Sequence, residues 1–330
     1  PDGKYLVVGN NGQRNRLYRL DGQTLTLVDA TSETDSTYSV AWTPDGKYLA
    51  VGNAGQANRL YKFNDETLTL VDSTSEVDFT YSVAWTPDGK YLAVGNYPQA
   101  NRLYKLDGET LTLVDSTSET DSTYSVAWTP DGKYLAVGNY GQVSRLYRLD
   151  DQTLTLVDTT SVTIDGTISV AWTPDGKYLA VGNYAGAGIS GINKLYRLDG
   201  ETLSSVDSTS EQDDTYSVAW TPNGRYLATG NNGQANRLYR LDGETLTLID
   251  TTSETDNTES VAWTPDGKYL AVGNDGDVNR LYETIFGPSS EVQAPSNSII
   301  FQDLQNGIEP DASVHVLGGT RVILNGLMHL

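Results

Sequence analysis

The sequence predicts an all-β protein folded as a seven-bladed propeller of four-stranded antiparallel blades. The segment Val-Ala-Trp-Thr-Pro-Asp-Gly-Lys-Tyr-Leu-Ala-Val-Gly-Asn recurs along the chain, and its tryptophans are spaced by 43, 43, 44, 48 and 43 residues. A period in the low forties made of strand-like pieces is typical of propeller blades. The turn Pro-(Asp/Asn)-Gly-(Lys/Arg)-Tyr-Leu occurs seven times, starting at Pro1, Pro44, Pro87, Pro130, Pro174, Pro222 and Pro265.

One repeat divides into four short segments rich in β-forming residues, called A to D: residues 39–42, 48–51, 59–63 and 67–71. Proline and glycine in residues 43–47 favour a tight A–B turn, and residues 64–66 favour a tight C–D turn. Residues 52–58 and 72–80 are longer polar connections. We therefore expect one face of tight turns and one face of longer loops, with binding on the loop face or at the mouth of the axial channel.

The shared residues resemble WD40-like and YVTN-like propeller repeats over residues 1–286. The resemblance rests on Val-Ala-Trp-Thr-Pro-Asp-Gly-Lys-Tyr-Leu-Ala and on Arg-Leu-Tyr-Arg-Leu-Asp-Gly. The Trp-Asp pair of WD40 blades is replaced by Leu-Tyr, as at Leu60-Tyr61, and the Gly-His pair is absent. The buried network and the partners of eukaryotic WD40 proteins are therefore not implied.

The strand count predicts two missing strands. The first repeat lacks segment A and the last lacks segment D, and an open sheet edge needs a cover. The tail, a segment outside this sequence or another molecule would each supply them. Residues 287–330 break the repeat, contain short apolar runs, and resemble the start of a parallel β-helix or a small β-domain. We expect domains at 1–286 and 287–330, and, because the sequence starts inside a turn motif and ends after another, a mature product or fragment.

Amino-acid composition argues against several classes of partner and of enzyme chemistry. The formal net charge of −21 disfavours nucleic acid and anionic lipid as partners. No apolar stretch is long enough for membrane insertion, and the absence of cysteine excludes thiol chemistry. Both histidines lie in the tail, and residues that repeat in every blade give equivalent environments, whereas an acid–base pair needs different ones. We therefore expect no enzyme activity and no cofactor.

Residues that recur with the period are expected to build the blades. The interpretation for the tryptophans is that each fills the wedge between neighbouring blades: Trp42, Trp85, Trp128, Trp172, Trp220 and Trp263. The acidic D–A loops are expected to form a solvated rim. Their alternative role is a Ca²⁺ site, although the spacing of a known calcium loop is missing; the residues are Asp72, Glu76, Asp78, Asp115, Glu119 and Asp121.

Partner contacts are expected where the repeat is broken. The fifth repeat has an insertion at 184–193 and an apolar D–A loop before it, and the tail has an apolar run. The candidate contacts are Ile164, Tyr184, Ile189, Ile192, Ile299, Ile300 and Phe301.

The sequence therefore predicts a non-enzymatic structural or interaction protein. Near-identical blades suit a scaffold, and the open edges suggest self-association by strand or tail exchange, as in a filament subunit or an adhesin module at the cell surface. The alternatives are a propeller that binds Ca²⁺ or carbohydrate on its loop face, a cytoplasmic location, and a lactonase-like hydrolase.

Overall fold

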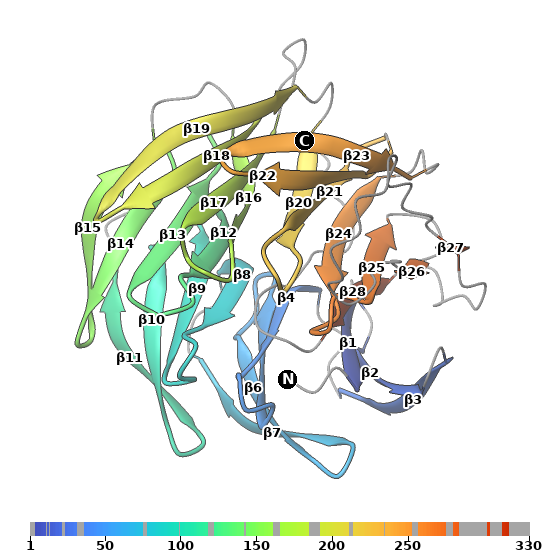
Figure 1. The fold of residues 1–330 in the computed structure, drawn as a ribbon. Coiled ribbons are helices and arrows are strands. Elements are labelled where there is room, and N and C mark those ends of the chain that lie inside the picture. The colour runs from blue at the N-terminus through green and yellow to red at the C-terminus, as the bar shows by residue number, and fades with distance from the viewer. Residues whose placement is uncertain are drawn as a thin grey trace.

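The computed structural model shows a ring of seven four-stranded antiparallel sheets (Figure 1). It describes residues 4–10, 12, 14–21, 24–31, 36–74, 78–98, 100–117, 122–141, 143–160, 166–184, 192–210, 214–233, 235–252, 257–274, 280–283, 302–303 and 312–316. Within these ranges there is no helix, and so no helix that could span a membrane. The predicted fold class is confirmed.

Each blade consists of four strands in the order A, B, C and D, with A nearest the axis of the ring and D at its rim. The A strands are β28 (Ala312–Val316), β4 (Thr37–Trp42), β8 (Phe79–Trp85), β12 (Thr123–Trp128), β16 (Thr167–Trp172), β20 (Thr215–Trp220) and β24 (Thr258–Trp263). The B strands are β1 (Tyr5–Asn10), β5 (Tyr48–Asn53), β9 (Tyr91–Tyr97), β13 (Tyr134–Asn139), β17 (Tyr178–Asn183), β21 (Tyr226–Asn231) and β25 (Tyr269–Asn274).

The outer strands follow the same order. The C strands are β2 (Arg16–Asp21), β6 (Arg59–Asn64), β10 (Arg102–Asp107), β14 (Arg145–Asp150), β18 (Ile192–Asp199), β22 (Arg237–Asp242) and β26 (Arg280–Glu283). The D strands are β3 (Thr24–Ala30), β7 (Thr67–Ser73), β11 (Thr110–Ser116), β15 (Thr153–Thr159), β19 (Thr202–Ser210), β23 (Thr245–Thr251) and β27 (Gln302–Asp303).

The A–B turn is held by its own side chains. Asp45 Oδ1 accepts hydrogen bonds from Thr43 Oγ1 at 2.7 Å and from the Lys47 amide at 3.1 Å. Gly46 has a φ of 71°, which a residue with a Cβ adopts only with strain. The sequence Thr-Pro-Asp-Gly-Lys therefore fixes the hairpin that joins the two most buried strands of each blade.

Strand ends differ from the prediction in a consistent way. Strand B was expected to end at 51 and continues to Asn53, and strand D was expected to end at 71 and continues to Ser73. The loop expected over 52–58 is thus shorter, and both asparagines at its ends are buried, Asn53 at 1% and Asn58 at 3% exposure. Polarity suggested a solvated loop, whereas these side chains bond inside the blade.

The tail supplies both missing strands. Strand β28 pairs antiparallel with β1 and completes the first blade, and β27 pairs with β26 and completes the last. Of the three sources left open by the strand count, the structure has the tail of the same chain. We call the junction of the last and first blades, closed by β28, the seam (Figure 1).

Candidate functional site

The six tryptophans lie at the ends of the A strands, packed between blades. Trp85 lies in a cluster with Ala41, Ala50 and Leu60 of the preceding blade and with Tyr104 of its own. The tryptophans are 5–8% exposed. Five indole nitrogens donate to an alanine carbonyl of the preceding blade at 3.1–3.2 Å, from Trp85, Trp128, Trp172, Trp220 and Trp263.

The same tryptophans surround a cavity on the propeller axis. Its volume is about 450 Å³, and each of six blades contributes a tryptophan and the proline two residues after it, as in Trp42 and Pro44. The cavity lies at the A–B turn end of the inner strands, which we call the turn face. Because five of the indole N–H groups bond to backbone, these rings present carbon to the cavity.

A buried polar ladder lies at the opposite end of the blades, which we call the loop face. The second and sixth blades have all of its bonds, and Ser144 replaces its second asparagine in the fourth blade. In the second blade, Thr37 Oγ1 donates to Asn53 Oδ1 at 3.2 Å, and the Asn53 amide donates to Asn58 Oδ1 at 3.1 Å. The Asn58 amide then donates to Thr74 Oγ1 at 3.1 Å. The ladder satisfies backbone groups where strands end, as buried polar groups require. The recurrence of both asparagines with the period was its signal in the sequence.

Seven aromatic rings lie in an unbroken line across four blades at the loop face. We call them the aromatic arc: Tyr38, Phe79, Tyr81, Tyr97, Tyr124, Tyr140 and Tyr184. Tyr81 stacks on Tyr124 at 4.7 Å and 6° and on Tyr38 at 5.2 Å. The line continues from Tyr124 to Tyr140 and on to Tyr184, each step being 5.4 Å.

The arc breaks the sevenfold repetition. The position of Tyr97, Tyr140 and Tyr184 holds Ala54 in the second blade and Asn232 in the sixth. Asn232 Nδ2 donates to the Tyr216 hydroxyl at 3.0 Å, so polar contacts follow where the stacked rings end. The arc thus gives the loop face one aromatic side.

The arc combines covered rings with open ones. Tyr124 is 9% exposed, whereas Phe79 and Tyr97 are 41% and 42% exposed. Burial raises the pKa of Tyr81 to about 12 and also raises that of Tyr124. The phenols therefore stay protonated at neutral pH, and they offer ring faces and hydroxyl groups to a ligand rather than charge.

The acidic residues named as Ca²⁺ candidates do not lie together where the structure describes them. Asp72 Oδ2 accepts from the Leu111 amide of the next blade at 2.6 Å, and Asp115 Oδ2 does the same with Leu154 at 2.7 Å. Asp78 forms an ion pair with Arg102 at 3.3 Å.

Glu76, Glu119 and Asp121 lie outside the described residues. Among the described side chains, no three His, Cys, Asp or Glu residues gather in a group that could hold a metal ion. The Ca²⁺ site stays a prediction. The carboxylates of Asp72 and Asp115 each link two neighbouring D strands, and that of Asp78 pairs with Arg102.

The partner-contact candidates have mixed placement. Tyr184 closes the aromatic arc, and Ile192 begins β18. Ile164, Ile189, Ile299, Ile300 and Phe301 lie outside the described residues. The other six rings of the arc were not singled out from the sequence, because their contacts join residues of neighbouring blades that lie far apart in the chain.

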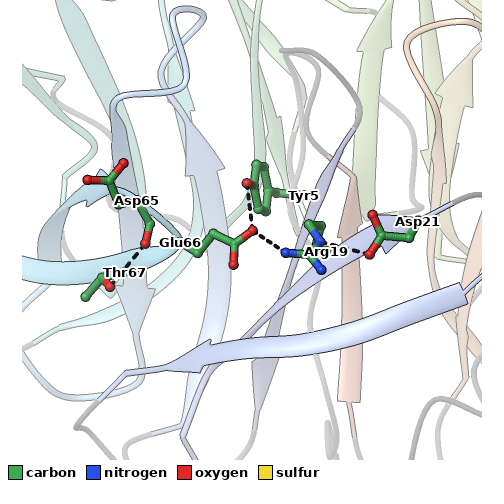
Figure 2. Close-up of polar contacts among 6 residues, drawn as sticks. All are labelled: Tyr5, Arg19, Asp21, Asp65, Glu66 and Thr67. Carbon is green, nitrogen blue, oxygen red and sulfur yellow. Dashed lines mark hydrogen bonds and ion pairs between the residues drawn. The ribbon is translucent and has the colours of Figure 1, made fainter.

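Neighbouring blades are also linked by ion pairs on the turn face. Figure 2 shows Arg19 of the first blade between Asp21, at 2.9 Å, and Glu66 of the second blade, at 2.6 Å. The Tyr5 hydroxyl donates to the same Glu66 carboxylate at 3.2 Å. Lys62 and Glu109 repeat the pair one blade further on. These groups are partly exposed, so each pair contributes little to stability.

Family comparisons agree with this architecture. The model of the WD domain, G-beta repeat, matches residues 200–236 and 247–279. The model of eukaryotic translation initiation factor eIF2A matches residues 53–210. A search of curated protein sequences gives no match.

Solved propellers share the fold at low identity. A Lactobacillus plantarum protein has a TM-score of 0.81 and 16% identity, over 96% of this chain and 99% of its own. A proposed 6-phosphogluconolactonase from Bacteroides fragilis has a TM-score of 0.79 and 16% identity, over 96% and 99%. The β-propeller domain of Cps50 (Swd1) from Myceliophteria thermophila has 0.68 and 14%, over 82% and 90%. The chain is a seven-bladed β-propeller, and its residues 200–236 and 247–279 match the WD40 repeat.

Proposed function

We propose that this chain is a non-enzymatic interaction propeller that binds a basic protein segment on its loop face. The aromatic arc carries the proposal, because its rings form a continuous line on one side of an otherwise repetitive molecule. Phe79 and Tyr97 leave more than two fifths of their surface open, at 41% and 42%. Exposed aromatic side chains that are already packed on one side are typical anchors of protein interfaces.

The charge of the chain favours a basic partner. Lys and Arg number 22 against 43 Asp and Glu, and this excess attracts cationic segments over distances of about a Debye length. Protonated tyrosine rings then offer faces to Arg and Lys side chains through cation–π contacts, each contributing about 0.5–1 kcal/mol at exposed sites. Neutral carbohydrate would use the same rings without the charge, and it is the competing ligand class.

The test compares variants of the arc with variants of the rim. Phe79→Ser and Tyr97→Ser remove the two open rings, whereas Leu70→Ser and Leu113→Ser remove rim side chains of similar exposure, 46% and 51%. Binding of a panel of Arg/Lys-rich peptides and of neutral oligosaccharides is measured by interferometry. The arc variants are expected to weaken peptide binding about tenfold and the rim variants to leave it unchanged.

Two results would contradict this function. Binding of oligosaccharides but not of peptides would show that the ligand is a carbohydrate. Unchanged peptide binding in both arc variants would show that the aromatic arc is not the binding site. Turnover of simple lactones by the purified chain with added divalent metal would favour the hydrolase instead.

Self-association is the second candidate, and the tail strands favour it. Both strands that complete the first and last blades, β28 and β27, come from the tail. Chains that exchange tails would close each other's rings with the same pairing, and exchange continued from chain to chain would build a filament. We place such an assembly at the cell surface, with a cytoplasmic location as the alternative.

Sedimentation velocity over a range of concentrations, with negative-stain imaging, tests the assembly. Linked discs are the expected result. Single discs at every concentration would reject self-association by tail exchange. Digestion by a protease added to intact source cells separates a surface location from a cytoplasmic one.

A further inference from the structure

The ring-closing strand β28 is an imperfect copy of a repeat A strand. Val316 pairs with Leu6 as Trp42 pairs with Leu49 in the second blade, and Val314 pairs with Val8 as Val40 pairs with Val51. Ser313-Val314-His315-Val316 therefore occupies the register of Ser-Val-Ala-Trp. The serine and first valine match, whereas histidine replaces the alanine and valine replaces the tryptophan.

The side of the seam that faces the last blade lacks an indole. Among the described side chains, the core here contains only Leu6, Val8 and Ala271 as buried residues. Each of the six other interfaces contains a buried tryptophan. The side chain of valine has neither an aromatic ring nor an N–H group, so Val316 does not supply the indole that the repeat places at the other six interfaces.

The side that faces the second blade lacks a hydrogen bond. Trp42 Nε1 is buried and has no partner among the described residues, unlike the other five indoles. Its acceptor in the repeat would be the carbonyl of the residue in the register of Ala41, which in β28 is His315. Strand β28 packs against β24 and β25 of the last blade, while the contacts of β4 with the first blade are mainly with β1. A buried N–H without a partner is costly, so the site favours a strand that supplies the acceptor.

We infer that the inner edge of β1 is a binding site for a strand of repeat sequence supplied by another molecule, an extended segment carrying Ser-Val-Ala-Trp, in place of the chain's own tail. Backbone pairing with β1 does not depend on which chain supplies the strand. Every residue carries the backbone carbonyl, so alanine at the third position would act through its small side chain, which lets the strand approach Trp42 closely. Tryptophan at the fourth position would fill the last-blade side. The inference goes beyond tail exchange, because the preferred strand is not the tail sequence, and it is independent of the aromatic arc.

Peptide binding to the full chain tests the site. The probe is a fluorescent peptide with the sequence of residues 122–133, Ser-Thr-Tyr-Ser-Val-Ala-Trp-Thr-Pro-Asp-Gly-Lys. The comparison peptide carries Ala127→His and Trp128→Val, which gives it the side chains of the tail. The repeat peptide is expected to bind at least about tenfold more tightly, a difference of about 1.4 kcal/mol. Hydrogen exchange should show faster exchange of the amides at 312–316 when it is bound.

A variant of the tail separates this site from non-specific binding. His315→Ala with Val316→Trp makes the tail match the repeat, so the melting temperature should rise and affinity for the repeat peptide should fall at least about tenfold. Leu70→Trp adds a tryptophan on β7, far along the chain from the tail and at a position that is 46% exposed, and it should change neither. Phe79→Ser should leave peptide binding unchanged, which keeps this result distinct from the loop-face function.

Three results would overturn the inference. They are equal affinity for the two peptides, absence of binding, and unchanged affinity in the His315→Ala, Val316→Trp variant.

Discussion

The indole nitrogen of Trp85 donates a 3.1 Å hydrogen bond to the carbonyl oxygen of Ala41 in the preceding blade. One side chain therefore both fills the wedge between two blades and bonds them. Four further blades repeat the bond, whereas Trp42 beside the seam has the ring without the bond.

Replacing Trp128 by Phe should destabilise the protein more than replacing Trp42 by Phe. Both indoles are similarly buried, at 5% and 7% exposure, but only Trp128 donates to a carbonyl, that of Ala84 at 3.1 Å. The difference in the free energy of unfolding should be about 1 kcal/mol, the net contribution of one hydrogen bond. Urea denaturation measures it, and equal losses would show that the bond adds nothing to the packing.

Gly95→Ala should destabilise the interface between the third and fourth blades. A Cβ at Gly95 would lie 2.7 Å from Thr123 Cγ2 of the next blade, too close without movement. The expected loss is about 1–3 kcal/mol, as for other overpacked cores. Thr123→Ser removes that methyl group and keeps the hydroxyl that donates to Asn139 at 2.9 Å. Gly95→Ala should therefore cost less when it is combined with Thr123→Ser, and a double-mutant cycle in urea with no coupling would reject the contact.

Asp207→Asn and Asp250→Asn should have different effects. Asp207 Oδ2 accepts from the Leu246 amide at 2.6 Å, so the first substitution should cost about 1–2 kcal/mol. Asp250 Oδ2 is buried without a partner among the described residues. The second substitution should cost less or stabilise the fold.

The pH dependence gives the control for Asp250. Burial raises the pKa of Asp250 above its ordinary value of 3.8, so the folded chain holds this proton more tightly than the unfolded chain. Its contribution is present below pH 3.8 and is lost as the pH rises through the folded pKa. Thermal melts of Asp250→Asn from acidic to neutral pH should lack this loss. If Asp250→Asn loses as much stability with rising pH as the wild type does, other titrating groups cause the loss.

Ionisation of Tyr81 in the aromatic arc should also lower the stability of the protein in strong alkali. Burial raises the pKa of Tyr81 from 10.0 to about 12, so the folded chain keeps a proton that the unfolded chain releases. The contribution is present below about pH 10 and is lost as the pH rises towards about 12. Tyr81→Phe should reduce the loss, measured by urea denaturation at mildly and strongly alkaline pH with tyrosinate absorbance as the second signal. An unchanged loss in Tyr81→Phe would contradict the role of this ring.

The repeat sequence was sufficient to predict the propeller. Its period defined the blade, and residues such as Pro44 and Gly46 defined the hairpin between the A and B strands. Strand ends were less accurate, because the polarity of Asn53 and Asn58 indicated solvent, whereas the structure buries both in a ladder. A polar residue inside a blade and one in a loop look alike until the hydrogen-bond partner is known.

The candidate site was less predictable than the fold. Tyr184 was singled out because it stands at a break in the repeat, but the stack of Tyr81 on Tyr124 joins residues 43 positions apart in neighbouring blades. Asp72 was named because carboxylate oxygens can bind Ca²⁺. In the structure its carboxylate accepts a hydrogen bond from the Leu111 amide of the next blade.

The sequence by itself determined the number of blades, the turns and the buried tryptophans, because each depends on residues close together and repeated seven or six times. Tertiary structure alone decided that the tail closes the ring, that β28 takes the register of an A strand, and that seven rings share one face. These depend on contacts between distant segments, and a periodic pattern carries no information on which segment will occupy the one place where the period stops.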